Sequence, residues 1–333
     1  MVEMLKGIYL LSTDAYELIY GGNECEDITR LVDIYAPPQT KESVESNPAV
    51  LRDADIIFSG WGTSRMDADF LNAATRLRAV FHAAGSIRSV VSEAFWTRNI
   101  LITSAYAANA IPVAEYTLSQ ILFCLKLGWQ HYISVRKKKT WVRYKPVFGV
   151  YKSTVGIISL GVISRKVIEL LKPFDLKILV YSNHLTEEKA TELNVEQCSL
   201  DEIFERADVV SLHSPSLEKT RGMITGKHIA SMKPYASFIN TARGAIVRED
   251  EMVKVLRRRP DLQAVLDVTW PEPPESDSPL YTLPNVALTP HIAGSMDSEC
   301  TRMGRYMVDE LVRFLDGEPL RWAISQEKAS VIA

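Results

Sequence analysis

The sequence predicts an α/β protein with two Rossmann-like domains, each a doubly wound parallel sheet, and a cleft between the two domains. Three observations carry this expectation. Short apolar or β-branched runs alternate with segments of helical periodicity, which is typical of parallel sheets covered by helices on both faces. This alternation occurs twice, once on each side of a long helical segment. The chain also has 333 residues, which suits two domains of about 100–200 residues better than a single core.

The first strand–helix series occupies the amino-terminal part of the chain. Its expected strands are residues 8–12, 55–59, 78–82 and 100–103. A helix is expected at residues 67–74, and a long helix follows the last strand. Pro112 is expected near the start of that long helix, where a missing N–H group is harmless. A basic run then indicates a solvated connector, with contact to an anion or a partner as the alternative. It comprises Arg136, Lys137, Lys138, Lys139, Arg143 and Lys145.

The second series begins near residue 153. Its expected strands are residues 154–159, 177–181, 209–213, 237–240, 264–267 and 286–289. A helix at residues 164–171 follows the first of these strands. The last helix is amphipathic, covers residues 299–315 and ends before Gly317, a residue type that is common at helix C-termini.

Composition and charge exclude several classes of function. The formal net charge of −3 gives no basic excess for binding a nucleic acid backbone. No window approaches the ~20 uninterrupted apolar residues of a membrane-spanning helix, and residues 1–11 are expected to form a strand rather than a signal peptide. The four cysteines lie far apart without metal-ligand or redox spacing, so we expect no metal site and reduced thiols in a cytoplasmic protein.

A turn that joins a strand to a helix carries an altered dinucleotide fingerprint. The usual pattern is G-x-G-x-x-G, and here its three glycine positions are Ser159, Gly161 and Ser164. The middle glycine, which lets the backbone approach a pyrophosphate, is kept, and serine is small enough for the third position. At the first position, serine is expected to cost some strain in the tight turn. The following helix start, with Val162 and Ile163, can still hold a phosphate.

The next strand carries the position that separates NAD from NADP. An acidic residue there normally binds the adenosine 2′-hydroxyl group and repels a 2′-phosphate. Here the position is Ser182, followed by Asn183, and no arginine stands beside it. The cofactor is therefore either NAD or NADP.

Three residues supply the chemistry that the reduction of a keto acid requires. Arg243 offers a permanent cation for a carboxylate. His291 supplies an imidazole, the side chain that is best suited to proton exchange near neutral pH. Glu272 can orient an imidazole ring and favour its protonated form. Taken alone, Arg243 is more often a surface arginine, His291 a structural histidine and Glu272 a solvated loop acid. All three follow strands of the second series, however, and ligands of open α/β sheets bind beyond the carboxyl ends of strands.

Several stretches together form a recognisable pattern. They are residues 113–115 (Val-Ala-Glu), 154–164, 207–215 with Thr220, 240–244, 266–273 and 289–294. By their order and spacing, the chain from about residue 83 to residue 322 resembles the D-isomer-specific 2-hydroxyacid dehydrogenases. The resemblance implies an oxidoreductase that transfers a hydride between a nicotinamide cofactor and a small 2-hydroxy or 2-keto acid.

The resemblance also implies a division of labour between domains. Residues 1–104, completed by residues 300–333, would form the substrate-binding domain. Residues 105–299 would form the dinucleotide-binding domain, through which family members commonly form homodimers.

Residue roles follow from the same resemblance. Arg243 would bind the substrate carboxylate, His291 would be the acid/base and Glu272 would tune it. Asp267 would meet the nicotinamide carboxamide. Further cofactor contacts would come from His213, Pro215, Thr220, Thr241, Ala242 and Gly294.

The loop expected to hold the substrate carboxylate departs from the family pattern. It reads Ala-Gly-Ser-Ile-Arg at residues 84–88, one residue shorter than usual and without the usual acid. The backbone N–H groups of Gly85 and Ser86 can still bind a carboxylate. Arg88 adds a cation or faces solvent, and Tyr106 stands where a proline is common. The identity of the acid therefore stays open.

Two alternatives share this fold. The first is an NAD(H)-binding regulatory protein without turnover, similar to transcriptional corepressors. The altered glycine positions of the fingerprint are the reason to consider it. The second is a related enzyme that acts on formate, against which the resemblance argues because residue 272 is a glutamate rather than an amide.

Overall fold

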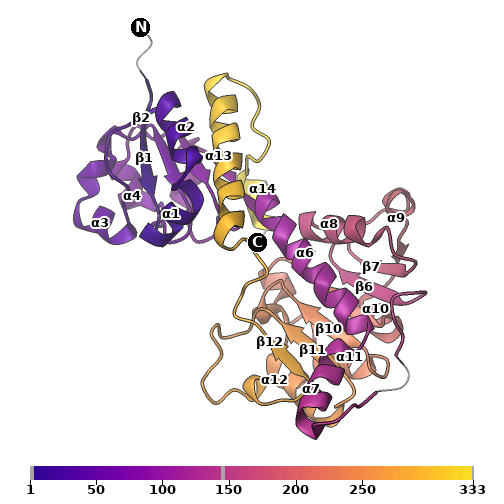
Figure 1. Ribbon diagram of the computed structural model, residues 1–333. Coiled ribbons are helices and arrows are strands. Elements are labelled where there is room, and N and C mark those ends of the chain that lie inside the picture. Colours follow the sequence, from indigo (N-terminus) through magenta and orange to yellow (C-terminus); the bar gives the residue numbers. More distant parts are fainter. Residues whose placement is uncertain (1–3, 144–146, 332–333) are drawn as a thin grey trace. The chain divides into compact units, whose positions relative to one another are not determined.

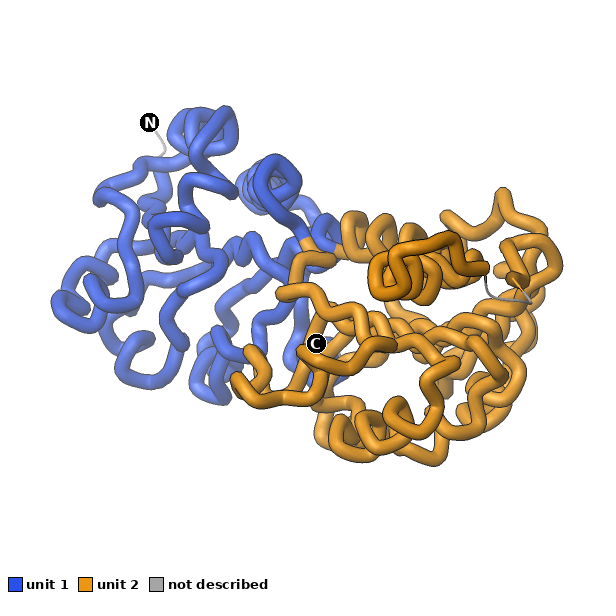
Figure 2. Tube along the Cα trace, turned by 60° about the horizontal axis from the view of Figure 1, so that its bottom comes forward, with its two compact units in different colours: residues 1–109, 295–333 blue, residues 110–294 orange. Residues whose placement is uncertain are grey.

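The computed structural model describes residues 4–143 and 147–331. It divides into two compact units, residues 1–109 with 295–333 (unit 1) and residues 110–294 (unit 2; Figure 2). The sequence places the same divisions at 104/105 and 299/300. The structure differs because the first turn of the long helix and residues 295–299, which precede the helix Cys300–Leu315, belong to unit 1. There Asn109 Oδ1 accepts a hydrogen bond from the Ser295 amide at 2.8 Å.

Unit 1 is built on a parallel sheet of five strands in the order β2-β1-β3-β4-β5. The strands are β1 (Lys6–Leu10), β2 (Asp33–Ile34), β3 (Ile56–Ser59), β4 (Ala79–His82) and β5 (Leu101–Ser104). Its helices are α1 (Thr13–Tyr20), α2 (Asn23–Leu31), α3 (Lys41–Ser46), α4 (Ala68–Ala73), α5 (Glu93–Trp96), α13 (Cys300–Leu315) and α14 (Gln326–Val331).

Alternating strand residues of unit 1 feed two separate cores. Tyr9 and Phe58 join the core under α1, α2 and α13, and Ile8 and Ile57 join the core under α3, α4 and α5. Successive side chains of a strand point to opposite faces, so a strand covered on both sides needs apolar residues at every position. The doubly wound architecture expected for this unit is confirmed.

The carboxyl-terminal segment completes unit 1. Figure 1 shows α13 (yellow) beside α1 and α2, and the backbone of α13 at Gly304 approaches α1 so closely that a Cβ would lie 2.2 Å from the Ile19 carbonyl oxygen. Further along, Ala323 pairs with Thr103 as an antiparallel bridge on β5. The segment therefore extends both the helical layer and the sheet.

Unit 2 is built on a parallel sheet of seven strands in the order β12-β11-β10-β9-β6-β7-β8. The strands are β6 (Thr154–Ile158), β7 (Lys177–Tyr181), β8 (Glu196–Gln197), β9 (Val209–Leu212), β10 (Ser237–Asn240), β11 (Gln263–Leu266) and β12 (Val286–Leu288). Its helices are α6 (Tyr106–Leu125, which begins in unit 1), α7 (Gly128–Lys138), α8 (Val162–Leu171), α9 (Glu187–Leu193), α10 (Leu200–Arg206), α11 (Gly226–Ser231) and α12 (Glu249–Arg258).

This sheet is also covered on both faces. Residues of α6, α8 and α9 pack in one core, and residues of α10, α11 and α12 pack in the other. The strand order reverses between β6 and β9, and in such sheets the ligand site lies beyond the carboxyl ends of the strands at this switch point. The second doubly wound sheet expected from the sequence is confirmed.

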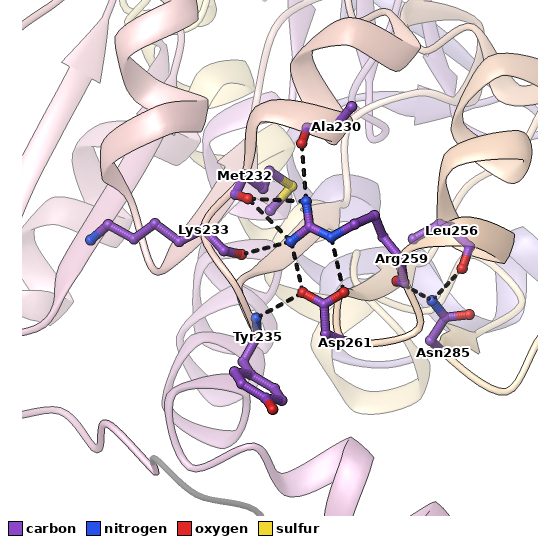
Figure 3. Close-up of polar contacts among 8 residues, drawn as sticks. All are labelled: Ala230, Met232, Lys233, Tyr235, Leu256, Arg259, Asp261 and Asn285. Carbon is purple, nitrogen blue, oxygen red and sulfur yellow. Dashed lines mark hydrogen bonds and ion pairs between the residues drawn. The ribbon is translucent and has the colours of Figure 1, made fainter.

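The opposite end of the sheet, before β10, β11 and β12, is held by a polar network (Figure 3). The Arg259 guanidinium donates to the carbonyls of Ala230, Met232 and Lys233 and pairs with Asp261 at 2.7 Å. Hydrogen bonds from Arg259 lower the pKa of Asp261. This network ties together loops at the end of the sheet that carries none of the proposed catalytic residues.

Two expectations about the middle of the chain are wrong. Pro112 lies in the interior of α6 rather than near its start, because the alanine-rich stretch before it is also helical. The first part of the basic run is not a connector: Arg136, Lys137 and Lys138 form the last turn of α7, where cations complement the helix dipole, and Lys139 caps it. Arg143 follows the helix, and Lys145 lies outside the described residues.

Across the described residues, no single helix has the length and apolar character needed to cross a membrane. Helices α6 and α7 meet the length and composition criterion only as a pair, and that pair is bent by 61°.

Candidate active site

The turn after β6 has the geometry of a dinucleotide-binding turn. Ser159 adopts φ 81°, in the left-handed region that favours glycine, so the expected strain at this position is present. Gly161 is the N-cap of α8, and a Cβ built on it would have no atom of residues 4–143 or 147–331 within 4 Å. Ser164 is fully buried, and its hydroxyl group has no hydrogen-bond partner in the described part of the chain. The open space at Gly161 beside the first-turn amides of α8, which carries Val162 and Ile163, fits a pyrophosphate.

The position after β7 is next to this turn, because β7 pairs with β6 in parallel. Ser182 is buried, and its Oγ accepts a hydrogen bond from the His184 amide at 3.2 Å. Asn183 is exposed. No carboxylate occupies this strand end, so nothing in these two side chains repels a 2′-phosphate.

The loop after β9 carries three of the expected cofactor residues. His213 is buried, its Nε2 lies 2.9 Å from the Ser211 hydroxyl oxygen, and burial lowers its pKa to about 4. Its Nδ1 has no partner among the described residues. Thr220 braces the same loop by donating to the Pro215 carbonyl at 2.6 Å and accepting from the Leu217 amide at 2.8 Å.

Arg243 is positioned by a tight loop after β10. The Asn240 side chain accepts from the Ala242 amide at 3.0 Å and donates to the Arg243 carbonyl at 3.1 Å. The guanidinium is half-buried, and burial lowers the pKa of Arg243 while the charge of Glu272 opposes this. An arginine nevertheless stays protonated in proteins. Thr241, next along, lies with its hydroxyl 3.4 Å from that of Thr117.

Gly244 joins the Arg243 loop to the loop that carries Glu272. A Cβ at Gly244 would lie 2.0 Å from the Thr269 carbonyl carbon and 2.5 Å from the Trp270 nitrogen. The Trp270 amide also donates to the half-buried Glu249 carboxylate at 3.1 Å, and burial raises the pKa of Glu249. These contacts fix the backbone that leads to Glu272.

Asp267, directly after β11, organises the loop that carries His291. Its buried carboxylate accepts hydrogen bonds from the Thr289 hydroxyl at 2.7 Å and from the Ile292 and Ala293 amides, each at 2.9 Å. This role adds to the contact with the nicotinamide carboxamide that the resemblance implies. A carboxylate has about four acceptor sites, so three internal bonds leave room for one more. Gly294 follows this loop as the last residue of unit 2.

The imidazole of His291 and the carboxylate of Glu272 form a hydrogen bond through Nδ1 and Oε1. His291 has φ 55°, and its amide donates to the Asp267 carbonyl at 2.9 Å, so the loop holds this residue in a rarely populated conformation. Because a carboxylate accepts at Nδ1, the Nε2 atom remains for proton exchange with another group. Both side chains are partly exposed, at 46% for His291 and 37% for Glu272.

The structure brings Arg243, Glu272 and His291 to one edge of one sheet. They follow β10, β11 and β12, which are neighbouring parallel strands, and Glu272 is near enough for its charge to affect the guanidinium of Arg243. Gly85 and Ser86 belong to unit 1, in the loop after β4. Within residues 4–143 and 147–331, no group of three or more His, Cys, Asp or Glu side chains could hold a metal ion.

Sequence reasoning missed the residues that hold this site in place. Asn240, Thr289 and Glu249 all position a loop that bears one of the three residues above. One signal was available, since Asn240 is a polar residue that ends an apolar strand and therefore needs a local partner. The contacts of Glu249 and Thr289 join distant positions and leave no pattern in the sequence.

Comparison with known proteins assigns this fold and site to a family. Residues 118–293 match the model of the D-isomer specific 2-hydroxyacid dehydrogenase NAD binding domain. A D-3-phosphoglycerate dehydrogenase of Methanocaldococcus jannaschii is 31% identical over 92% of this chain and 56% of its own length. A glyoxylate reductase of Korarchaeum cryptofilum is 30% identical over 89% of each chain. The chain spans about half the length of the D-3-phosphoglycerate dehydrogenases that it matches.

A solved structure shares the fold. The NAD complex of a D-isomer specific 2-hydroxyacid dehydrogenase from Lactobacillus delbrueckii ssp. bulgaricus superposes with a TM-score of 0.78 at 21% identity. The match covers 96% of this chain and 100% of that chain. Together with the family model and the sequence relatives, the order of the strands and the residues at their carboxyl ends lead to one assignment: the chain belongs to the D-isomer-specific 2-hydroxyacid dehydrogenase family.

Proposed function

We propose that this protein is an NAD(P)-dependent dehydrogenase that interconverts a small 2-hydroxy acid and the corresponding 2-keto acid. The observation that carries the proposal is the hydrogen-bonded His291–Glu272 pair at the same sheet edge as Arg243. The three relatives described above are dehydrogenases or reductases by name. None of them is a corepressor, and nothing in the described geometry favours a binding protein without turnover.

Each of the three residues has one task in the proposed reaction. The Arg243 guanidinium binds the substrate carboxylate and polarises the 2-keto oxygen. The nicotinamide cofactor, when bound by unit 2, would supply the hydride for C2 of the substrate. His291 gives the proton from Nε2 to the keto oxygen, which becomes the hydroxyl group, and Glu272 keeps the ring oriented and stabilises its charged form. In the oxidative direction, His291 takes the same proton back.

The proposed cofactor site uses the remaining strand ends of unit 2. The turn of Ser159 and Gly161 and the amides of Val162 and Ile163 would hold the pyrophosphate. Ser182 and Asn183 would meet the adenosine ribose. The nicotinamide side would be lined by His213, Pro215, Thr220, Thr241, Ala242, Asp267 and Gly294.

A screen of substrates tests the proposal. Purified protein is assayed with NADH and NADPH against glyoxylate, hydroxypyruvate, pyruvate, longer keto acids and phosphorylated keto acids. At least one pair should be turned over, and formate should not produce NADH. If no pair of nucleotide and keto acid is turned over, the proposal is overturned. If the protein then binds NADH tightly, the regulatory alternative is favoured.

Replacing the acid/base separates the site from the cofactor turn. We expect His291→Asn to lower kcat by about 10²–10⁴-fold, the usual contribution of a positioned acid/base. Ser159→Gly, which alters only the turn, should change kcat far less. Equal effects of the two substitutions on kcat would contradict the assignment of His291.

We further propose that the protein is a cytoplasmic homodimer joined through unit 2. Exposed apolar side chains gather on α6, α7 and the chain after them, where Phe123 is 42%, Tyr132 50% and Trp141 89% exposed. Such groups commonly mark protein interfaces. All four cysteines are free thiols, as is usual in a reducing compartment. Sedimentation velocity should give a dimer for the wild type and a monomer for Tyr132→Glu; a wild-type monomer would refute the dimer.

A further inference from the structure

Two buried side chains hold the loop after β4 by hydrogen bonds to three successive backbone carbonyl groups. The Ser104 hydroxyl lies 2.8 Å from the Ala84 carbonyl oxygen and 2.6 Å from the Gly85 carbonyl oxygen. Nε2 of His82 lies 3.2 Å from the Ser86 carbonyl oxygen. Both anchors come from strand ends, since His82 ends β4 and Ser104 ends β5, and both are almost completely buried.

These hydrogen bonds determine the direction in which the amide groups of the loop point. In a trans peptide, the C=O and N–H bonds are planar and point in opposite directions. Carbonyls turned inward at residues 84–86 therefore turn the N–H groups of Gly85, Ser86 and Ile87 outward. These three amides donate no hydrogen bond to any residue within 4–143 and 147–331. Consecutive free N–H groups on one side of a loop form a concave site for an anion.

The hydrogen-bond partners of His82 fix its tautomer, and burial keeps its ring neutral. The Ser86 carbonyl only accepts, so Nε2 carries the hydrogen, and Nδ1 accepts from the Ser59 hydroxyl at 2.9 Å. Burial lowers the pKa of His82 to about 4, so the ring is neutral at neutral pH. A neutral ring with a fixed tautomer can hold the Ser86 carbonyl without placing a charge under the loop.

We propose that His82 and Ser104 are positioning residues that pre-form a cradle of backbone amides for the carboxylate of the substrate. The inference rests on the proposed function, in which a small keto acid is the ligand. Neither side chain touches the substrate; both act through the carbonyl groups of residues 84–86. The cradle stands in place before the ligand arrives, so binding does not require the loop to be ordered.

Four variants test the proposal. His82→Met fills the space without a donor, whereas His82→Gln keeps an N–H group near the Nε2 position. Ser104→Ala removes the other anchor. Thr103→Val is the matched control, because it removes a buried hydroxyl from the same strand whose hydrogen bond goes to Met307 instead. Calorimetry measures the binding of oxalate, an unreactive carboxylate probe, to the protein with and without NADH, and steady-state assays with glyoxylate give KM and kcat.

The anchors should affect carboxylate affinity alone. We expect His82→Met and Ser104→Ala to weaken oxalate binding and raise the KM for glyoxylate by about 10-fold, as loss of about 1.4 kcal/mol would do. The kcat and the affinity for NADH should stay within about 2-fold of wild type. His82→Gln should retain most of the oxalate affinity, and Thr103→Val all of it. A substitution that merely loosened the fold would lower kcat and NADH affinity as well.

The oxalate measurements separate this proposal from the proposed function. A wild type that reduces no keto acid but binds oxalate, with loss in His82→Met and retention in His82→Gln, supports the cradle and defeats only the enzymatic assignment. Equal oxalate affinity in wild type, His82→Met and Ser104→Ala overturns the cradle, as does a wild type that binds no oxalate. If His82→Met does not fold, the oxalate affinity of Ser104→Ala decides: weaker binding than in the wild type supports the cradle, and equal binding overturns it.

Discussion

Ser159 shows how a single residue can depart from a motif while keeping its geometry. A non-glycine residue at φ 81° carries a steric penalty of about 1–2 kcal/mol, yet the chain retains this conformation at the turn. The penalty is tolerated because flanking contacts fix the turn, including a hydrogen bond of 2.7 Å from the Ser159 amide to the Tyr181 carbonyl. The contact with the neighbouring strand, rather than the preference of the residue at position 159, therefore determines the conformation of the turn.

We therefore predict that Ser159→Gly stabilises the protein. Glycine removes the steric penalty but adds entropy to the unfolded chain, so the expected net gain is at most about 1 kcal/mol. Thermal unfolding of the two proteins without cofactor measures the gain. A lower melting temperature for Ser159→Gly would show that the serine side chain makes a favourable contact at this turn.

A second prediction at this scale concerns the choice of nucleotide. Ser182→Asp places a carboxylate at the strand end where it can accept from an adenosine 2′-hydroxyl and repel a 2′-phosphate. The ratio of kcat/KM for NADH to that for NADPH should rise at least about 10-fold, since 1.4 kcal/mol of differential binding suffices for this. Ser182→Asn, which has the same size without the charge, is the control and should change the ratio little.

Residue chemistry and strand ends together were enough to predict the proximity of Arg243, Glu272 and His291. The residues whose hydrogen bonds fix the loops around these three side chains were harder to predict. Asp267 binds the backbone of Ile292 and Ala293 across 25 or 26 positions of sequence, and a contact of this kind has no local period. It depends on β11 and β12 lying side by side, which only the assembled sheet provides.

At the scale of elements, the strands were predictable because both sheets are buried on both faces and their strands are continuous apolar runs. The two-residue edge strands β2 and β8 escaped prediction, since two residues carry no periodicity. The sequence predicts helix α6 but not its first turns, because a proline such as Pro112 normally indicates a helix start. Its alanine-rich beginning favours helix strongly enough to place the proline inside.

Two glycines at loop–element junctions give a matched pair of predictions. Gly244→Ala would put a Cβ 2.0 Å from backbone atoms that cannot yield, so it should destabilise the protein by about 1–3 kcal/mol and lower activity. The added methyl group of Gly161→Ala meets no atom within 4 Å in the part of the chain that the structure describes, so the melting temperature should match that of the wild type. The added methyl group should instead weaken NADH binding, because it stands where the pyrophosphate would approach.

Melting temperatures and NADH dissociation constants distinguish the two glycine variants. The pattern should be a stability defect for Gly244→Ala and a binding defect without a stability defect for Gly161→Ala. If Gly161→Ala binds NADH as tightly as the wild type, the pyrophosphate does not lie at this turn.

At the scale of the whole molecule, two buried histidines make stability depend on pH. Burial lowers the pKa of His82 in unit 1 and of His213 in unit 2 to about 4, from an ordinary value of 6.5. Between these values the unfolded chain binds protons that the folded chain excludes. The contribution is therefore fully present above pH about 6.5 and is lost as the pH falls toward 4. The loss is up to about 3–4 kcal/mol for each ring, at 1.4 kcal/mol per pKa unit.

Melting temperatures at intervals from pH 7.5 to pH 4.5 check this prediction. His82→Gln and His213→Gln should each flatten the decline of the wild type, because each removes one group that titrates only when unfolded. Thr103→Val, which removes a buried group that does not titrate, should keep the full decline. A wild type whose melting temperature is constant across this range would contradict the buried, neutral state of both rings.

The path of the chain through unit 1 has a consequence for biosynthesis. Helix α13, which covers Phe81 and Thr103 of the first sheet, is encoded after the whole of residues 110–294. Ribosomes add about 5–20 residues per second, so the first sheet waits on the order of 10–40 s after its last strand for the helix that covers it. During translation, unit 2 is contiguous and can fold first, while the nascent residues 1–109 still expose the apolar surface that α13 later covers, and chaperones can bind it.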